Sequence, residues 1–360
     1  MIEGGLEVFM AGTTSLLFIL LAGSMSASEA ANAQAPQTNR AEPAAPSLPS
    51  RARMTIEVAD YCSPAQIAID ISQCGQAAIA AAGAGANAST GGGTVHFPAG
   101  LYKLLGTLRL DKSFVGLSGD GPQASTIRCA NGAADCVVVG IADKSTRDQH
   151  IDNMAISGDG AKTGGANISI RNTFNVRVER VQVENCIRCF DIGPGNNSVT
   201  LRDVVALPNQ ADADTGIYWH APGDGSARSD VLTLDNVVIE GQWSNATGIL
   251  WEGFANTLVA SHLRILHSRY GMRISNPSRS KSYFPSFMNA FDLEMEGFKT
   301  RALSIEAGRI SRSSAPTSAI SLEAPSRRMP TTSPCAFSPM RALRTRAVFR
   351  FRPRASAEAV

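Results

Sequence analysis

Five segments of the chain repeat one pattern of hydrophobic and polar positions: apolar, any residue, apolar, two polar residues, apolar, any residue, apolar. Segment 176–183 has valine at all four apolar positions, and segment 151–156 is a partial copy. The other copies have apolar residues at Val199, Leu201, Val204 and Ala206, at Leu232, Leu234, Val237 and Ile239, and at Leu258, Ala260, Leu263 and Ile265. Equivalent positions at 151, 178, 201, 234 and 260 are separated by 27, 23, 33 and 26 residues. Alternating apolar residues predict strands, and a repeat of this length predicts a solenoid of stacked coils.

A second apolar pair lies between the copies of the first pattern. It occurs at Phe190 and Ile192, Ile217 and Trp219, Ile249 and Trp251, Met272 and Ile274, and Leu303 and Ile305. Each coil therefore contributes at least two strands with inward-facing apolar residues. Gly216, Gly248 and Gly271 precede three of these pairs, where a tight corner favours a small residue. The polar pairs within the first pattern, such as Asp235 and Asn236, are expected to bond from coil to coil.

A capping α-helix is predicted at about residues 64–82, ahead of the coils. Ser63 offers a capping hydroxyl, Pro64 suits the first helical position, and Gly83 follows the end. The apolar face of this helix contains Ile67, Ile71, Cys74 and Ala78. The end of a solenoid exposes core residues and unpaired strand edges, so we expect the helix to cover that end.

The segment after this helix carries a family resemblance. It reads Gly91-Gly92-Gly93-Thr94-Val95-His96-Phe97-Pro98-Ala99-Gly100-Leu101-Tyr102, and short strands at 108–110 and 115–121 follow it. In this order, these features resemble the start of pectate-lyase-superfamily proteins, which include rhamnogalacturonase-like, polygalacturonase-like and epimerase-like proteins and phage tailspike-like depolymerases. The resemblance covers residues 55–310. It implies an all-β, right-handed, single-stranded parallel β-helix, a polysaccharide partner and, for a tailspike-like protein, a trimer.

The resemblance does not extend to catalytic motifs. Polygalacturonase-type enzymes carry Asn-x-Asp, Asp-Asp, Gly-His-Gly and Arg-x-Lys motifs in successive coils, and this sequence has neither an Asp-Asp pair nor a Gly-His-Gly. The acidic cluster that holds Ca²⁺ in pectate lyases has no clear counterpart either. The resemblance therefore implies a fold and an acidic polysaccharide substrate, and candidate catalytic residues must come from the register of the coils.

Two outward-facing columns follow from the second strand of each coil. One column contains Asp191, Tyr218, Leu250, Arg273 and Ser304, and the other contains Gly193, His220, Glu252, Ser275 and Glu306. Neighbouring coils lie about 4.8 Å apart, so His220 and Glu252 are expected side by side. We predict catalytic roles for Asp191, His220, Glu252 and Glu306, and substrate binding by Tyr218 and Arg273. The alternative is that these residues are the solvated surface of a structural coil.

Two reactions suit these residues. Glycoside hydrolysis needs two carboxyl groups, about 5 Å apart for retention or about 6.5–9.5 Å apart for inversion. Glu252 and Glu306 are two coils apart, about 9–10 Å, at the edge of the inverting range. Elimination instead needs a base such as His220, with Arg273 or a bound Ca²⁺ neutralising a uronate.

No cofactor is expected for hydrolysis, and Ca²⁺ is expected only for a lyase. Asp212, Asp214 and Asp224 lie in acidic loops that offer oxygen ligands or simply form turns. Three functions stay open: an exported enzyme that cleaves polysaccharide, a non-catalytic carbohydrate-binding or structural β-helix, and a truncated, inactive product.

Composition and the N-terminus restrict location and partners. The formal net charge of the 360-residue chain is +2, which gives no basis for nucleic-acid binding. Residues 1–35 resemble a signal peptide, with an apolar core at 15–22 and a small-residue cleavage site at 31–35, although Glu3 and Glu7 precede the core. Residues 36–54 are rich in Pro, Ala and Ser and are expected to be a linker. The mature protein is thus expected to be secreted or periplasmic, with no membrane association.

Six of the seven cysteines form close pairs in the sequence. The pairs are Cys62 and Cys74, Cys129 and Cys136, and Cys186 and Cys189, and Cys335 is left over. Local disulfides and buried thiols are both compatible with this spacing. A zinc site at Cys186 and Cys189 is disfavoured, because no second pair has zinc-ligand spacing.

The coil pattern stops near residue 310. Residues 311–360 contain nine arginines and no lysine, together with much Ser, Pro and Ala. This composition predicts a disordered basic tail. A sharper hypothesis is that the reading frame shifts near residue 310, because off-frame translation of GC-rich DNA produces this bias. Another frame of the coding sequence should then resume coil repeats beyond that point, and the hypothesis fails if none does.

Overall fold

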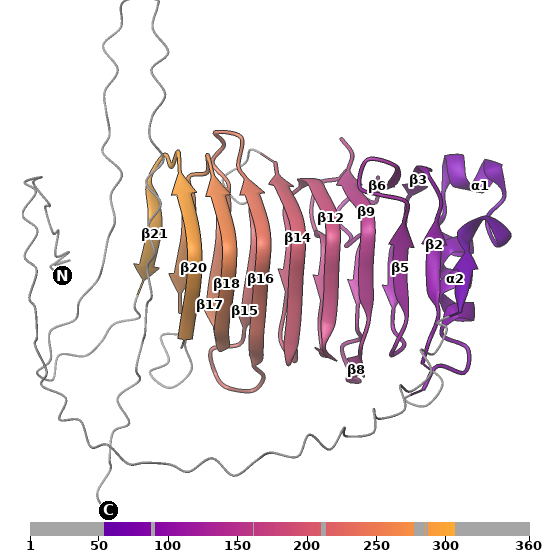
Figure 1. Cartoon of the computed structure of the whole chain (residues 1–360), viewed down its shortest axis with the longest axis horizontal. Helices are drawn as coiled ribbons and strands as arrows, with labels where there is room; N and C mark the ends of the chain where they lie inside the picture. The colour runs from indigo at the N-terminus through magenta and orange to yellow at the C-terminus, as the bar shows by residue number, and fades with distance from the viewer. Residues whose placement is uncertain are drawn as a thin grey trace, which may run out of the picture. The chain divides into compact units, whose positions relative to one another are not determined.

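Parallel strands stacked coil upon coil form most of the described chain (Figure 1). The computed structural model describes residues 54–87, 91–160, 162–209, 214–276, 285 and 287–306. Within these residues the strands form sheets of eleven, eight and two strands. The predicted signal peptide and linker, except Met54, and the basic tail with Cys335 lie outside the described residues.

The eleven-stranded sheet has the order β1-β2-β5-β9-β12-β14-β16-β18-β20, with β6 pairing both β3 and β9. Its strands are Thr55–Glu57 (β1), Thr94–Phe97 (β2), Gly100–Leu104 (β3), Gly116–Gly119 (β5), Ser125–Cys129 (β6), His150–Gly158 (β9), Val176–Cys186 (β12), Ser198–Pro208 (β14), Ser229–Glu240 (β16), Ala255–Leu266 (β18) and Phe287–Glu296 (β20). The first sequence repeat lies in this sheet.

The eight-stranded sheet has the order β21-β19-β17-β15-β13-β10-β7-β4. Its strands are Leu108–Leu110 (β4), Val137–Val139 (β7), Ala166–Ile170 (β10), Arg188–Ile192 (β13), Thr215–Ala221 (β15), Thr247–Gly253 (β17), Tyr270–Ser275 (β19) and Arg301–Glu306 (β21). Two short strands, Thr146–Arg147 (β8) and Thr173–Phe174 (β11), form the third sheet. The second sequence repeat lies in the eight-stranded sheet and extends further toward the N-terminus than the sequence indicated.

The register confirms the predicted inward positions. Val178 pairs with Leu201, Leu201 with Leu234, and Leu234 with Ala260, and all four are fully buried. A sixth copy in β20 escaped the sequence pattern because Phe291, 52% exposed, occupies a position that is polar in the other copies. In the opposite sheet Trp219 stacks on Trp251 with ring centroids 4.9 Å apart. The core is thus a set of apolar columns that run from coil to coil.

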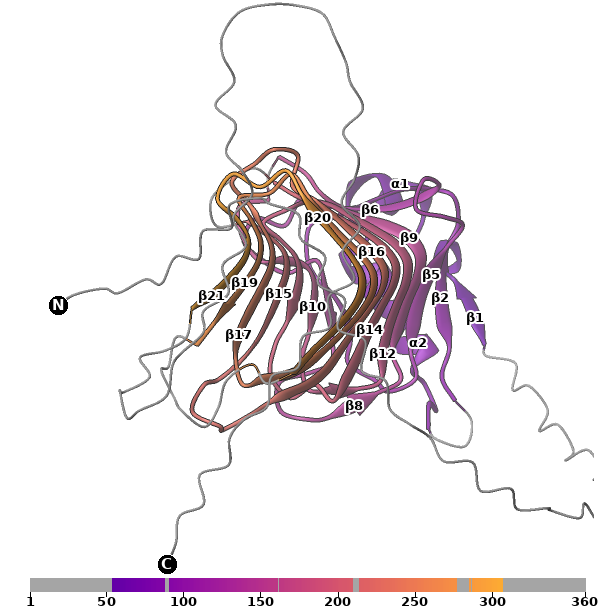
Figure 2. The ribbon, with the colours of Figure 1, turned by 60° about the vertical axis from the view of Figure 1, so that its left-hand side comes forward.

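Each long strand of the eleven-stranded sheet bends at its polar pair, as Figure 2 shows for β12, β14 and β16. One residue of each pair has left-handed backbone conformation: Asn153, Arg180, Asp203, Asn236, His262 and Asp292, with φ between 50° and 57°. Asn and Asp tolerate this conformation better than most residues.

The polar pairs also bond between coils, as expected. Arg180 contacts Asp152 at 2.6 Å, and Asn236 donates to the carboxylate of Asp203 at 2.7 Å. Arg202 contacts Asp235 in the next coil at 3.1 Å. Corner contacts of this kind join coils through side chains as well as through the strand ladder.

Two helices, rather than the single predicted one, cover the N-terminal end. They are Pro64–Ile69 (α1) and Ser72–Ala82 (α2), and a 3₁₀ turn, Val58–Asp60 (η1), precedes them. Ser63 and Gln66 form a capping box at the predicted start, and Gly83 caps the predicted end. No helix among the described residues is long and apolar enough to cross a membrane.

The break between the helices has a local cause. The Asp70 carboxylate accepts hydrogen bonds from the backbone N–H groups of Ser72 at 2.9 Å and Leu105 at 3.0 Å. The N–H of Ile71 donates to the carbonyl of Lys103 at 2.9 Å instead of continuing the helix. The cap is therefore bonded directly to the chain at the end of β3, a tertiary contact that outweighs helix propensity.

The glycines before the second apolar pairs are required because a side chain at these positions would collide with the neighbouring coil. A Cβ on Gly248 would lie 2.4 Å from Cγ2 of Ile265 and 2.5 Å from the carbonyl oxygen of Gly271. The backbone oxygen cannot move away without breaking the coil contact. This explains the small residue predicted at the corner.

We predict that Gly248→Ala lowers the free energy of unfolding by about 1–3 kcal/mol, because the added methyl overpacks the corner. Gly160→Ala is the matched control, since a Cβ there meets nothing within 4 Å. Urea denaturation of both variants and the wild type measures the difference. Equal losses in the two variants would contradict the spatial explanation.

Candidate functional site

The two predicted outward columns exist in the eight-stranded sheet. Asp191 pairs in register with Tyr218, Tyr218 with Leu250, Leu250 with Arg273, and Arg273 with Ser304. In the second column, His220 pairs with Glu252, Glu252 with Ser275, and Ser275 with Glu306. The six predicted site residues therefore lie on one face, across five consecutive coils.

Asp191 lies beneath this face and is surrounded by cationic groups. Its side chain is 4% exposed, and its carboxylate contacts Nη1 of Arg188 at 3.0 Å and Nη2 of Arg171 at 3.9 Å. Burial raises the pKa of Asp191, but the hydrogen bond from His220 and the nearby charges of Arg171, Arg188 and, when it is protonated, His220 outweigh burial and lower this pKa. Asp191 is therefore ionised at neutral pH.

Because ionised Asp191 can only accept a hydrogen bond, His220 must donate to it. Nε2 of His220 lies 2.9 Å from Oδ1 of Asp191. This contact places the proton on Nε2 and leaves the lone pair of neutral His220 on Nδ1. Asp191 thus orients His220, as a carboxylate orients the histidine in a catalytic triad.

Tyr218 links His220 to Glu252. The rings of Tyr218 and His220 are stacked, with centroids 4.1 Å apart and planes 12° apart. The Tyr218 hydroxyl donates to Oε2 of Glu252 at 2.9 Å, and the Ser275 hydroxyl donates to Oε1 at 2.6 Å. Burial and the negative charge of Glu252 raise the pKa of Tyr218 well above its usual value, so its hydroxyl stays protonated.

Arg273 and Glu306 form a separate pair at the C-terminal end of the face. Nε and Nη2 of Arg273 contact the two carboxylate oxygens of Glu306 at 2.8 and 2.9 Å. The hydrogen bond to Glu306 raises the pKa of Arg273. Glu306 therefore neutralises Arg273, and Ser275, rather than Glu306, hydrogen bonds to Glu252.

Sequence reasoning missed two polar residues of this site, Arg171 and Arg188, and it placed Ser275 in an outward column without giving it a role. Arg171 follows Ile168 and Ile170, an apolar pair of the second repeat that was not recognised. Arg188 lies between the close cysteines Cys186 and Cys189. Continuing the repeat upstream would have found Arg171, but no sequence pattern directs Arg188 toward Asp191.

The three close cysteine pairs are disulfides. Cys62 is bonded to Cys74, Cys129 to Cys136, and Cys186 to Cys189. This outcome selects disulfides over buried thiols and is incompatible with zinc binding at Cys186 and Cys189. The last of these bonds joins the end of β12 to β13, two residues before Asp191.

The structure gives no direct support for a Ca²⁺ site among the described residues. They contain no group of three or more His, Cys, Asp or Glu side chains that could hold a metal ion. Asp224 instead accepts a hydrogen bond from the N–H of Ser226 at 2.9 Å, which supports the turn interpretation. Asp212 lies outside the described residues. We therefore assign no reaction step to Ca²⁺.

No protein-family model matches the chain, and no curated protein matches it by sequence. Among solved structures, the N-terminal fragment of bacteriophage phi29 gene product 12 matches with a TM-score of 0.54, 16% identity, and coverage of 69% of this chain and 43% of that chain. The A-module of an Azotobacter vinelandii mannuronan C-5 epimerase matches with a TM-score of 0.48, 21% identity, and coverage of 70% of each chain.

The catalytic unit of an α-1,3-glucanase from Streptomyces thermodiastaticus matches with a TM-score of 0.46 and 19% identity, covering 70% of this chain and 50% of that chain. The chain thus spans half or less of the length of the phi29 and glucanase structures. At these identities the similarity concerns the fold alone. The phi29 match is the one of these three with a TM-score above 0.5, and it supports the fold. The stacked parallel sheets of this chain confirm the right-handed parallel β-helix implied by the resemblance to pectate-lyase-superfamily proteins.

We predict that Asp191→Asn lowers the free energy of unfolding at pH 7 by about 1.5–3 kcal/mol, the usual value of a hydrogen bond to a charged group. The folded-state pKa of Asp191 is lowered, so its stabilising contribution is present above the unfolded value of about 3.9 and is lost as the pH falls through the folded-state pKa. The difference in free energy of unfolding between the variant and the wild type should therefore become smaller in acid.

Urea denaturation between neutral pH and about pH 2 measures this narrowing. Asp60→Asn is the control, because Asp60 is exposed at the cap. A difference that stays constant down to the lowest pH would contradict an ionised, paired Asp191.

Proposed function

We propose that this protein is exported, binds an acidic polysaccharide on the outer face of the eight-stranded sheet, and cleaves it by β-elimination. The observation that carries the proposal is the continuous contact from Asp191 through His220 and Tyr218 to Glu252. An oriented histidine, a protonated phenol and a carboxylate lie within one row of contacts. The resemblance to pectate-lyase-superfamily proteins supports an acidic polysaccharide as the substrate class.

Elimination requires a base, an acid and a cation. In the proposed step, Nδ1 of His220 takes the proton from the sugar carbon next to the carboxyl group. The electron pair left on that carbon forms a double bond as the glycosidic C–O bond breaks. The leaving oxygen takes the proton of the Tyr218 hydroxyl, which Glu252 orients.

The remaining predicted residues assist this step. Asp191 is a positioning residue that sets the tautomer of His220. Arg171 and Arg188 are 45% and 44% exposed and can face a uronate carboxylate, whose neutralisation makes the adjacent proton more acidic. We assign substrate binding to Arg273, whose guanidinium plane Glu306 holds in place.

Elimination suits the face better than hydrolysis does. An inverting hydrolase needs one carboxylic acid with a raised pKa to protonate the leaving oxygen. Asp191 has a lowered pKa, and Glu306 is bonded to Arg273 through both carboxylate oxygens. Neither residue therefore suits the role of the acid, and Glu252 already accepts hydrogen bonds from the Tyr218 and Ser275 hydroxyls on its two oxygens.

A carbohydrate-binding face without catalysis is the second candidate function. The pairing of Arg273 with Glu306, and of Arg188 with Asp191, favours it, because these charges already satisfy one another. Such a face would bind polysaccharide through its aromatic and polar surface and release no product. The trimer implied by a tailspike-like resemblance stays a prediction.

Export is supported by the three disulfides, since disulfides persist mainly in oxidising compartments. We accordingly place the mature protein in the periplasm or outside the cell. The expected signal peptide at residues 1–35 provides the route.

We expect His220→Gln, which removes the base, to reduce turnover about a hundredfold or more, the usual contribution of an acid–base group. Glu252→Gln should also reduce turnover, because Glu252 orients the hydroxyl of Tyr218. Purified variants would be incubated with pectin, rhamnogalacturonan, alginate and bacterial exopolysaccharides. Ultraviolet absorbance detects the unsaturated uronate that elimination leaves, and a reducing-end assay detects either kind of cleavage.

Glu294→Gln is the matched control, because Glu294 lies in β20 of the other large sheet. Turnover equal to that of the wild type in both site variants would contradict the assigned site. New reducing ends without an increase in ultraviolet absorbance would show that the protein cleaves by hydrolysis and not by elimination. Binding without either product would favour the carbohydrate-binding function.

A further inference from the structure

An open hollow of about 420 Å³ lies on the same sheet face, toward the N-terminal cap. Its lining includes Arg109 of β4, Val138 of β7 and Arg171, which follows β10. Arg109 pairs with Val138, Val138 with Ser169, and Ser169 with Asp191. The hollow therefore lies along the same outward column as Asp191 and Tyr218, a few coils earlier.

Close backbone packing forms part of the floor of the hollow. Gly140 has φ of 87°, and a Cβ there would lie 1.9 Å from the carbonyl oxygen of Arg171. No side chain can therefore fill this position. Val138, 9% exposed, supplies a small apolar floor beside it.

Two guanidinium groups and one carboxylate line the hollow. Nη2 of Arg171 lies 3.8 Å from the Asp135 carboxylate and 3.9 Å from that of Asp191, beyond hydrogen-bond distance in both cases. The backbone of Arg109 is fixed by two hydrogen bonds with the side chain of Gln76. Among the described residues, the Arg109 guanidinium forms no ion pair. The lining is thus net positive, with donors left for an anion.

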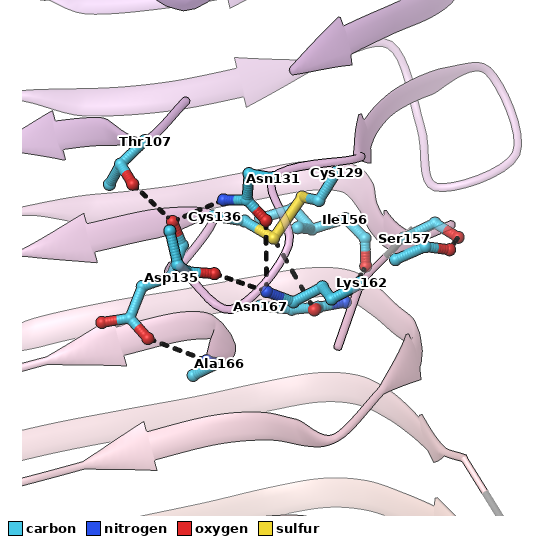
Figure 3. The surroundings of a disulfide bond; sticks show 12 residues. Thr107, Cys129, Asn131, Asp135, Cys136, Ile156, Ser157, Lys162, Ala166 and Asn167 are labelled. Carbon is cyan, nitrogen blue, oxygen red and sulfur yellow. Dashed lines mark hydrogen bonds between the residues drawn. A yellow bond between two sulfur atoms is a disulfide. The ribbon is translucent and has the colours of Figure 1, made fainter. Parts of the chain in front are cut away.

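The wall of the hollow is a loop closed by the Cys129–Cys136 disulfide (Figure 3). Asn131 and Thr107 both donate to the backbone carbonyl of Asp135, at 2.8 and 2.7 Å. Lys162, 6% exposed, donates to the carbonyl of Ala134 at 2.6 Å. These bonds hold the wall in one conformation, so little ordering is needed when a ligand binds.

From this arrangement we propose that the hollow is a second anion subsite. Arg109 and Arg171 bind the carboxylate or sulfate of a sugar unit that lies upstream of the unit at His220. Arginine suits this role because its planar fork matches both anions. Arg171 connects the two positions, since it faces Asp135 in the hollow and Asp191 at the site. The subsite rests on the proposed function for its role in cleavage, although its anion binding can be measured separately.

Nuclear magnetic resonance titration of isotope-labelled protein tests the subsite. Galacturonate and sulfated galactose provide the two anions, and galactose is the neutral probe. We expect either anion, but not galactose, to shift the backbone resonances of Ala134 and Gly140. The anion that binds more tightly indicates whether the natural sugar unit carries a carboxylate or a sulfate group.

Arg109→Gln should weaken anion binding about tenfold, through the loss of one charge-assisted contact. Arg128→Gln removes the same charge from an exposed position in β6 of the other large sheet and should bind as wild type. Asp135→Asn should bind more tightly, because it removes a negative charge from the lining. Wild-type affinity in Arg109→Gln, or equal losses in both arginine variants, would overturn the subsite.

The outcomes also separate this proposal from the proposed cleavage. If no polysaccharide is cleaved but galacturonate or sulfated galactose binding depends on Arg109, the cleavage proposal fails and the subsite stands. If turnover depends on Glu252 while Arg109→Gln behaves as wild type, the subsite alone fails.

Discussion

Each coil of this protein buries its apolar side chains only by lying in register on the coils before and after it. A single coil has too little apolar surface to fold alone, and its strand edges have unpaired backbone groups. The stacked columns of Val178, Leu201 and Leu234, and of Trp219 and Trp251, satisfy both needs. A one-residue slip would turn these side chains outward, so the register is strongly fixed.

The same register assembles the outer face. Asp191, His220 and Glu252 belong to three successive coils, yet each is placed within reach of its neighbours. The scaffold is rigid because inward packing, corner bonds and disulfides all act on the backbone that carries these residues. A face of this kind can hold acid, base and cation in fixed positions, which is the main requirement for catalysis by orientation.

Burial of one charge determines the electrostatics of the face. Asp191 is nearly inaccessible, and an isolated carboxylate there would be costly. Arg171, Arg188 and His220 offset this cost, and they reach Asp191 from three different strands or strand ends. The compensation of the buried Asp191 charge thereby places His220, with a defined tautomer, on the surface. The hollow upstream shares Arg171, so the two proposed anion positions are electrostatically linked.

The sequence determined the features that depend on local periodicity. Alternation identified the strands, the spacing of the repeats identified the coils, and counting along them placed His220 beside Glu252. The helix start at Ser63 is also local, because it depends on neighbours in the chain. The spacing of the cysteines paired them correctly, but it did not decide between disulfides and buried thiols.

Only the tertiary structure decided the contacts that join distant segments. The helix breaks at Asp70 because Leu105, far along the chain, supplies a competing N–H group. Glu306 binds Arg273, and Arg188 turns toward Asp191, because side-chain direction depends on what neighbouring coils offer. Periodicity fixes which side of a strand a residue occupies, whereas partners and burial on that side are set by packing between coils.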